Sequence, residues 1–268
     1  MSQQEQWQVA GNAAENYERY LVPSIFGPWA ATLIELANPQ PGERLLDVAC
    51  GTGIVARLAS NRVGSQGRVV GLDLNPSMLA VARALPSSTS ITWQEGSALA
   101  LPFPDETFDV VCCQQSLQYF PDQAAALGEM YRVLVPEGRL ALAVWQPIEH
   151  SPGFASLAQA LEQYVSPEAA ALARAPFALG NAEELQTLIT EASFRDVVIR
   201  PAVKTLHFPS VEAFVQHYVA GSPLAGLVAQ VDDSARTGLL EEVQAKLASY
   251  VDEGLGFPIE AHLATATR

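Results

Sequence analysis

The stretch RLLDVACGTGIVARL, Arg44 to Leu58, predicts a β-strand, a glycine turn and the beginning of a helix. Apolar residues precede the turn, and an apolar pattern with helical spacing follows it. Glycine adopts positive φ and allows another group to approach the main chain closely. Gly51 and Gly53 therefore indicate a ligand that lies against the backbone. Two ligand classes fit such a turn, a dinucleotide and an adenosyl amino acid.

The composition of the 268 residues allows one large domain, or one domain with an elaborated cap. Hydrophobic residues make up 49% of the chain and charged residues 16%, which is enough apolar material for a sizeable core. The formal net charge of -14 argues against nucleic-acid binding, because that affinity depends on Lys and Arg that neutralise phosphates. For the same reason we expect no stable association with an anionic membrane.

The first twenty residues lack the basic and apolar regions of a signal peptide. We also expect no membrane-spanning helix, because no stretch approaches about 18 uncharged apolar residues. The three cysteines, Cys50, Cys112 and Cys113, form no CxxC pair. Together these features favour a cytoplasmic protein with unpaired thiols.

Apolar β-type runs alternate with helical runs between Arg44 and Trp145, which predicts a parallel sheet covered on both faces. Asn75 and Asp122 are the expected N-caps of two of these helices. The predicted strands are 44–48, 68–73, 91–94, 108–113 and 139–145, and the predicted helices are 53–62, 76–85 and 122–134.

The flanking segments are mostly helical. Residues 12–37 show a helical pattern broken by Pro23 and Pro28. Helices are further predicted over 154–175, 181–192, 210–220 and 234–250, and strands over 197–207 and 257–267. Open α/β sheets bind ligands at the carboxyl ends of their strands. We therefore expect one domain, 1–268, with an N-terminal helical lid (1–40), a core (41–145), cap insertions (146–178 and 209–250) and a final strand (257–267).

The glycine turn alone does not choose between the two ligand classes, because Gly51, Gly53 and Ala56 also satisfy the dinucleotide pattern. Asp73 follows the next strand, where a carboxylate can accept hydrogen bonds from both ribose hydroxyls. Asp47, however, stands before the glycines, where it can receive an ammonium group or orient the turn. The small residues 96–98 form a corner in which an adenine can lie flat, and Gln114 ends the fourth strand. These features favour the adenosyl amino acid.

Four segments, LLDVACGTG, VVGLDLNPSML, EGSALALPFPDETFDVV and YRVLVPEGRLAL, occur in the order and spacing of a known family. Over about residues 40–145 the sequence resembles class I S-adenosylmethionine-dependent methyltransferases, most closely the small-molecule enzymes of ubiquinone and menaquinone biosynthesis. The resemblance implies a Rossmann-like, doubly wound α/β fold with a mainly parallel seven-stranded sheet, an antiparallel last strand and helical cap insertions. It implies S-adenosyl-L-methionine as cofactor and S-adenosyl-L-homocysteine as product.

The resemblance also implies roles for single residues. It places the methionine part of the cofactor beside Asp47, Ala49, Gly51, Thr52 and Gly53. It places the ribose at Asp73, the adenine between Leu74, Met78, Ser97 and Ala98, and the sulfonium near Gln114. Two positions depart from the family pattern: Ala49 stands where glycine is frequent, and Ser97 replaces a frequent acidic residue.

The expected chemistry is an in-line displacement of the methyl group by an O, N, S or C atom of a small organic acceptor, in which the protein aligns the reactants and excludes water. His150 and Glu149 are weak candidates for a general base, which is needed only for a protonated acceptor. Tyr17 and Tyr20 could close over the cofactor, and Trp145 could wall the acceptor pocket, although core packing explains all three as well. Metal-ligand spacing is absent from the sequence, so we expect metal-independent catalysis.

Two other functions stay open at this point. One is a nicotinamide-dependent oxidoreductase, which the Gly51, Gly53 and Ala56 pattern allows. The other is a sensor or scaffold that binds S-adenosylmethionine without catalysis, because binding residues do not by themselves establish turnover.

Overall fold

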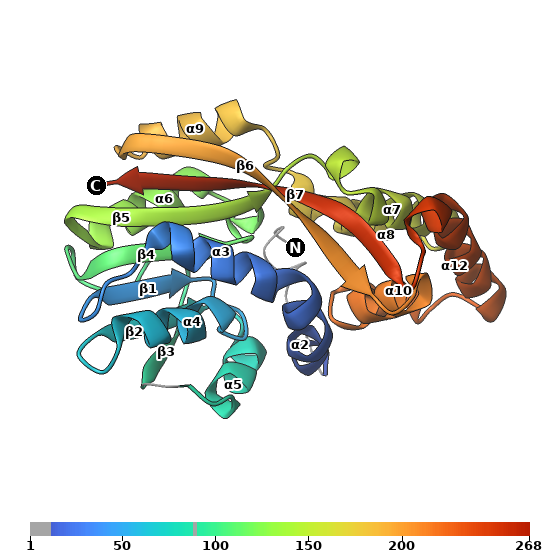
Figure 1. Cartoon of the computed structure of the whole chain (residues 1–268), viewed down its shortest axis with the longest axis horizontal. Coiled ribbons are helices and arrows are strands. Elements are labelled where there is room, and N and C mark those ends of the chain that lie inside the picture. The colour runs from blue at the N-terminus through green and yellow to red at the C-terminus, as the bar shows by residue number, and fades with distance from the viewer. Residues whose placement is uncertain (1–11, 88–89) are drawn as a thin grey trace.

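A computed structural model describes residues 12–87 and 90–268, so the first eleven residues of the predicted lid lie outside the described part. The predicted seven-stranded sheet is confirmed, with the strand order β3-β2-β1-β4-β5-β7-β6 (Figure 1). Its strands are β1 (Arg44–Val48), β2 (Arg68–Asp73), β3 (Ile91–Glu95), β4 (Phe108–Gln114), β5 (Leu134–Trp145), β6 (Arg195–Phe208) and β7 (Leu255–Thr267).

The direction of the strands also agrees with the prediction. β1 pairs in parallel with β2 and β4, β2 with β3, and β4 with β5. β7 runs antiparallel to both of its neighbours, β5 and β6. Because β1 lies between β2 and β4, the order of the strands reverses there, and the carboxyl ends of these strands border the crevice in which such sheets bind ligands.

The central strands β1, β2 and β4 are buried on both faces of the sheet, which explains their continuous apolar runs. Along β4, Val110 and Cys112 belong to the hydrophobic cluster on one face, whereas Val111 and Cys113 belong to the cluster on the other. This alternation follows from the two-residue period of a strand. Helices α3 and α4 cover the first face, and α6 and α9 cover the second (Figure 1).

Helices beyond the strand ends form the cap at one end of the molecule (Figure 1). The helices of the core and the N-terminal region are α2 (Ala13–Asn16), the π-helix η1 (Tyr17–Phe26), α3 (Gly27–Ala37), α4 (Ile54–Val63), α5 (Pro76–Ala84), α6 (Gln123–Val133) and α9 (Ala182–Glu191). Those of the cap are α7 (Pro152–Tyr164), α8 (Pro167–Arg174), α10 (Val211–Ala220), α11 (Leu224–Val228) and α12 (Asp233–Leu247). Short 3₁₀ turns span Leu117–Tyr119 (η2), Ile148–His150 (η3), Ala175–Phe177 (η4) and Ala248–Tyr250 (η5).

Both predicted helix caps are confirmed. The side chain of Asn75 accepts from the backbone N–H groups of Ser77 and Met78, and that of Asp122 accepts from Ala125. The prediction of one helix over 154–175 is wrong, because α7 ends at Tyr164 and α8 begins at Pro167. Proline has no N–H to continue a helix but fits the first turn of a new one.

The N-terminal helical segment runs without interruption from Ala13 to Ala37, so the predicted breaks at Pro23 and Pro28 are wrong. Pro23 lies inside η1, whose wider turns accommodate a residue that cannot donate a backbone hydrogen bond. Pro28 lies in the first turn of α3, where helices tolerate proline.

By length and composition, Ala13–Ala37 could also cross a membrane, which corrects the expectation that no stretch approaches this limit. It is one such helix in the part of the chain that the structure describes, and core helices of globular proteins meet the same criteria. Here Trp29, Leu33 and Ile34 are buried against the sheet.

A substitution at Gly53 tests how tightly the glycine turn packs against the sheet. Its φ is +86°, and a Cβ built there would lie 2.1 Å from the ring atom Cη2 of Trp93 on β3. We expect Gly53→Ala to lower the free energy of unfolding by about 2 kcal/mol or more, through backbone strain and overpacking.

The matched control is Gly128→Ala on the exposed face of α6, where an added Cβ meets no atom within 4 Å. This substitution should raise stability by about 0.5–1 kcal/mol, because alanine is the better helix former. Urea unfolding measures both. Equal effects of the two substitutions would contradict the packing of Trp93 beneath the turn.

Candidate functional site

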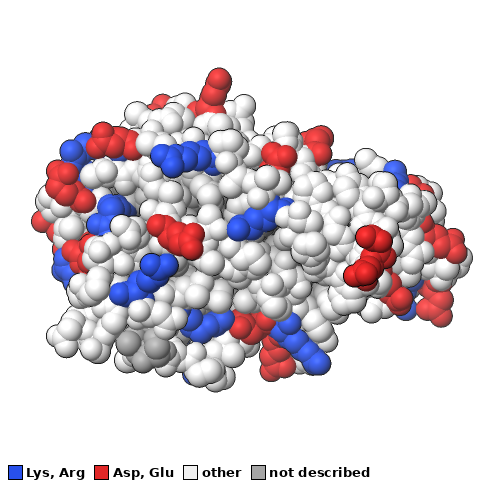
Figure 2. All heavy atoms as spheres, viewed as in Figure 1, with Lys and Arg blue, Asp and Glu red and all other residues white. Residues whose placement is uncertain are grey.

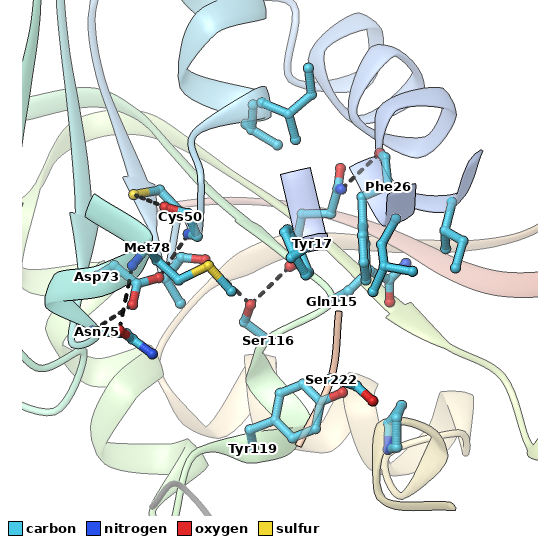
Figure 3. A pocket seen from close by; sticks show the side chains of 18 of the residues that line it. Tyr17, Phe26, Cys50, Asp73, Asn75, Met78, Gln115, Ser116, Tyr119 and Ser222 are labelled. Carbon is cyan, nitrogen blue, oxygen red and sulfur yellow. Dashed lines mark hydrogen bonds between the residues drawn. The ribbon is translucent and has the colours of Figure 1, made fainter. Parts of the chain in front are cut away.

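A cavity of about 190 Å³ lies at the carboxyl ends of β1, β2, β4 and β5, beneath the N-terminal helical segment and the cap (Figure 3). An ordered water needs only about 10–15 Å³ by this measure, so the space is far larger than a packing defect. Two regions line it. The glycine-turn half includes Asp47, Gly51, Asp73, Met78 and Ala98, and the aromatic half includes Phe26, Trp145, Phe154, Phe177 and Tyr218.

Asp73 at the end of β2 holds the glycine turn in place. One carboxylate oxygen accepts the backbone N–H of Gly51 at 2.7 Å, and the other accepts that of Asn75 at 2.8 Å. The backbone N–H of Leu74 also bonds to this carboxylate, and because a carboxylate offers about four lone-pair sites, Asp73 keeps capacity for a hydroxyl group of a ligand. Its burial raises its pKa. A hydroxyl-bearing ligand such as a ribose suits this position because it brings no further negative charge.

Asp47 is the second buried carboxyl group of the site and is 1% exposed. Its Oδ2 accepts the backbone N–H of Ala56 in the first turn of α4 at 3.0 Å. Burial, and secondarily the charge of Asp73, raise the pKa of Asp47 to about 8. A positively charged group bound nearby would favour the ionised form. The site is thus suited to a ligand with an ammonium or sulfonium group.

The turn itself leaves space for such a ligand at Gly51. Its φ is +55°, and a Cβ built there would find only Tyr17, at 3.9 Å, on the cavity side. Gly53 instead faces Trp93, so the two glycines have different physical roles. Ala49 also has a positive φ, +56°, which explains why the family often has glycine at this position.

Gln114 contributes an unused acceptor to the cavity. Its Nε2 donates to the backbone oxygen of Phe26 at 3.0 Å, while its buried Oε1 has no partner in the part of the chain that the structure describes. An ammonium group is a donor that would satisfy this oxygen. The open face of Gly51, the raised pKa of Asp47 and the unpaired Gln114 oxygen all fit an adenosyl amino acid.

Most of the predicted cofactor residues are brought together. Asp47, Ala49, Gly51, Asp73, Leu74, Met78, Ala98 and Gln114 line the cavity. Thr52, Gly53 and Ser97 do not. Thr52 is 1% exposed and its Oγ1 has no partner within residues 12–87 and 90–268, and the Ser97 hydroxyl accepts the backbone N–H of Leu99 at 3.2 Å.

Of the residues predicted to contact the acceptor or to act as a base, some line the cavity and others lie outside it. Tyr17 and Trp145 line the cavity. Tyr20 lies outside it and stacks on His217 with ring centroids 4.2 Å apart. His150 and Glu149 lie in η3, also outside the cavity lining, and His150 pairs with Glu260 at 3.1 Å. The structure therefore places neither weak base candidate in the cavity lining.

Sequence reasoning missed most of the aromatic half. Phe26, Phe154, Phe177 and Tyr218 come from η1, α7, η4 and α10, and they meet only after folding. It also missed Gln115, Ser116 and Tyr119, although these follow directly on the predicted end of β4 at Gln114. Their place after a parallel strand was a usable indication. Within residues 12–87 and 90–268, no three His, Cys, Asp or Glu side chains are grouped so that they could hold a metal ion.

Comparisons with known proteins agree with this geometry. Residues 46–142 match the family described as the methyltransferase domain. Over 149 residues the chain is 39% identical to the 2-phytyl-1,4-naphtoquinone methyltransferase of Synechococcus elongatus. The aligned residues cover 53% of this chain and 63% of that protein. The chain thus spans less than two thirds of the curated relatives it matches.

Two solved structures show the same fold. A candidate methyltransferase from Bacillus halodurans C-125 has a TM-score of 0.61 at 23% identity, over 89% of this chain and 97% of that chain. Phosphoethanolamine N-methyltransferase 2 of Haemonchus contortus, solved with S-adenosyl-L-methionine, has a TM-score of 0.55 at 19% identity. The match covers 90% of this chain and 52% of that chain. The resemblance to class I S-adenosylmethionine-dependent methyltransferases is therefore confirmed for the central segment and the fold.

Asp47 makes the stability of the ligand-free protein depend on pH. Its pKa is raised in the folded state, so its contribution to stability is complete below a pH of about 4 and is lost as the pH rises to about 8. Asp47→Asn keeps an oxygen for the Ala56 N–H but cannot ionise. Urea unfolding at pH 5 and pH 8 should show a larger loss of stability for the wild type than for the variant. An equal loss would contradict a buried acid with a raised pKa.

Proposed function

We propose that the protein transfers a methyl group from S-adenosyl-L-methionine to a small organic acceptor. The observation that carries this proposal is one cavity with two unlike halves. Buried carboxyl groups and an open glycine backbone line one half, and aromatic side chains line the other. A cofactor bound along the glycine turn would extend its sulfonium toward Gln114 and the aromatic half.

In this proposal the bound cofactor supplies a methyl group already activated by the sulfonium, so that the acceptor forms a bond to carbon as the carbon–sulfur bond breaks. The protein binds the ribose at Asp73 and the ammonium at Asp47 and Gln114. Tyr17, which lies over Gly51, closes the cavity to water. Alignment and exclusion of water are the expected sources of rate acceleration.

A base is not required when the acceptor brings its own nucleophilic lone pair or ionises before it binds. Among the residues that the structure describes, the charged side chains of the cavity lining are Asp47 and Asp73, both in the glycine-turn half. Burial raises the pKa values of Tyr17 and Tyr218, which keeps these phenols neutral. We propose that the protein acts without a general base of its own in the aromatic half.

The lining of the aromatic half also favours an apolar acceptor. The Synechococcus elongatus relative is named for an apolar ring compound, a phytyl naphthoquinone. We extend that chemical class, and not the compound, to this protein.

The N-terminal segment and the insertions 146–178 and 209–250 would act as lid and cap of a single domain, and the protein would work in the cytoplasm. On the face in Figure 2, acidic and basic side chains are interspersed, which offers nucleic acid no broad basic surface there.

Calorimetric titration with S-adenosylmethionine and S-adenosylhomocysteine tests the cofactor, with NAD as the control ligand. We expect both adenosyl ligands to bind and NAD not to bind. Asp73→Ala should lower the affinity for both adenosyl ligands by at least about tenfold. A carboxylate that accepts hydrogen bonds from a ligand contributes about 1.5–3 kcal/mol to the binding free energy.

The outcomes separate the rival functions. Binding of NAD without either adenosyl ligand would contradict the proposal in favour of a dinucleotide-dependent oxidoreductase. Binding of the adenosyl ligands without methyl transfer to any of a broad panel of apolar acceptors would favour the sensor or scaffold. Unfolding curves of Asp73→Ala show whether the substitution acts on the ligand or on the fold of the turn.

A further inference from the structure

A groove lies between α9 and the strands β6 and β7, at the edge of the sheet that β6 forms (Figure 1). Residues of α9 line one side of it, and Ile199, Pro201 and His262 line it from the sheet. The described lining of this groove shares no residue with that of the cavity at the glycine turn. The groove is therefore a second and separate concave site.

His262 of β7 is a buried imidazole with one unpaired nitrogen. The side chain is 8% exposed. Its Nε2 lies 2.9 Å from the backbone oxygen of Gly180, and because a carbonyl oxygen only accepts, Nε2 carries the hydrogen. In the neutral ring Nδ1 is then an acceptor, and it has no partner among the residues that the structure describes. A buried acceptor without a partner is unfavourable, so this nitrogen calls for a donor.

The two-residue period of β7 turns His262 toward α9. Ala264 and Ala266 follow with the same period and belong to the hydrophobic cluster beneath α6 and α9. On the neighbouring strand Pro201 stands opposite His262, and Ile199 stands opposite Ala264. The imidazole thus lies on the sheet side of the groove, beside two apolar side chains.

The α9 side of the groove also offers acceptors. The hydroxyl group of Thr187 donates its single hydrogen to the backbone oxygen of Glu183 at 2.9 Å, so its oxygen keeps only lone pairs for a ligand. The Glu183 side chain is an exposed carboxylate. Gln186 adds an amide, which can donate or accept. A ligand of this groove therefore needs donors.

The charges around the groove favour a cation. Its described lining contains the carboxylate of Glu183 and no Lys or Arg. The start of a helix attracts anions through free N–H groups. Here, however, the N–H groups of Glu183 and Glu184 already donate to the side chain of Asn181, at 2.8 and 3.0 Å. Glu184 adds a second negative charge to the same turn, so an anion is disfavoured.

We propose that this groove binds a primary alkylammonium ion. The ammonium group would donate to Nδ1 of His262 and to the Thr187 oxygen, and its charge would pair with Glu183. Its alkyl chain would lie against Ile199 and Pro201. A primary ammonium has three donors, which matches these three acceptors. The site lies outside the cavity and does not depend on methyl transfer.

Calorimetric titration of the full chain with four probes tests the chemistry of the groove. The probes carry a six-carbon chain: hexylammonium, hexyltrimethylammonium, 1-hexanol and hexanoate, all at pH 8, where a primary ammonium is still protonated. We expect hexylammonium to bind at least about tenfold more tightly than hexyltrimethylammonium, which has the charge but no N–H group. 1-Hexanol should bind more weakly than hexylammonium, and hexanoate most weakly.

Three variants and a matched control locate the bound ammonium. Glu183→Gln should lower the affinity for hexylammonium by at least about twofold, as an exposed charge pair implies. Thr187→Val, which keeps the shape but not the oxygen, should also lower it. His262→Phe should reduce the preference for hexylammonium over hexyltrimethylammonium by at least about fivefold. The control, Glu184→Gln, removes a neighbouring exposed carboxylate that does not line the groove, and should change the affinity less than Glu183→Gln.

The ¹⁵N NMR signal of His262 Nδ1 gives a readout inside the groove. Hexylammonium should shift this signal toward that of a hydrogen-bonded nitrogen, and hexyltrimethylammonium should not. The spectrum of His262→Phe identifies the signal among those of the four histidines.

Three results would overturn the proposal. Tightest binding by hexanoate would show an anion site. Equal effects of Glu183→Gln and Glu184→Gln would place the ammonium elsewhere, and this comparison uses exposed positions, so it holds even if His262→Phe does not fold. An Nδ1 signal that none of the four probes shifts would show that the imidazole holds an ordered water only.

Discussion

The site depends on two buried carboxyl groups that accept backbone hydrogen bonds from one glycine turn. Asp73 holds the N–H of Gly51, and Asp47 holds the N–H of Ala56. The backbone of the turn has a positive φ at Ala49 and is open at Gly51. The two carboxyl groups hold it at the cavity together with backbone hydrogen bonds such as that from the Cys50 N–H to the oxygen of Leu72. Burial raises the pKa of Asp47 to about 8, and a positively charged group bound beside it would favour its ionised form.

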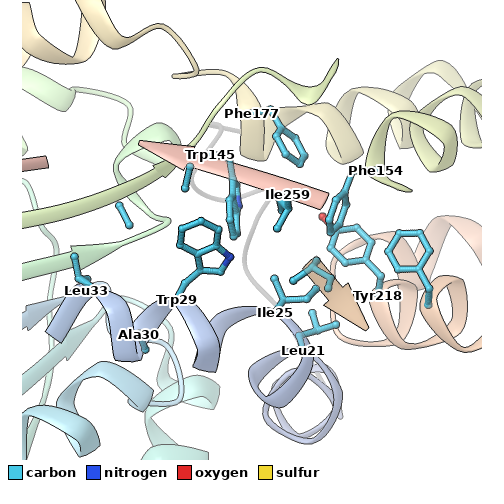
Figure 4. Close-up of a cluster of buried hydrophobic side chains, with 14 of the residues drawn as sticks. Leu21, Ile25, Trp29, Ala30, Leu33, Trp145, Phe154, Phe177, Tyr218 and Ile259 are labelled. Carbon is cyan, nitrogen blue, oxygen red and sulfur yellow. The ribbon is translucent and has the colours of Figure 1, made fainter. Parts of the chain in front are cut away.

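The turn also packs against the segment that lines both halves of the cavity. Trp93 fills the space behind Gly53 and supports the turn from the side away from the cavity. On the cavity side Tyr17 covers it, and the same N-terminal segment carries Phe26 to the ring of Trp145. Trp29 of this segment packs against Trp145 as well (Figure 4). The Glu18–Arg57 ion pair at 2.8 Å ties this segment to α4. The glycine-turn half and the aromatic half of the cavity therefore share one wall.

The sequence was sufficient for the sheet and for the glycine-turn half, because both depend on local patterns. Alternating strands and helices predicted the parallel sheet, and the positions of Asp47 and Asp73 relative to the strand ends placed them in the cavity. The aromatic half could not be predicted in the same way. Phe154 and Tyr218 are more than sixty residues apart in the chain, and only the packing of the cap brings their rings together. Pro23 was misleading because a π-helix tolerates it, which propensity rules for α-helices do not anticipate.

The most direct test of the central claim is to count the protons released when S-adenosylhomocysteine binds at pH 7. Calorimetry in two buffers with different enthalpies of ionisation gives this number for the wild type and for Asp47→Asn. If a buried acid with a pKa of about 8 ionises to meet the ligand's ammonium group, the wild type should release about one proton more than the variant. Equal proton release by the two proteins, with the ligand bound, would show that Asp47 does not receive the ligand's charge and would contradict the account.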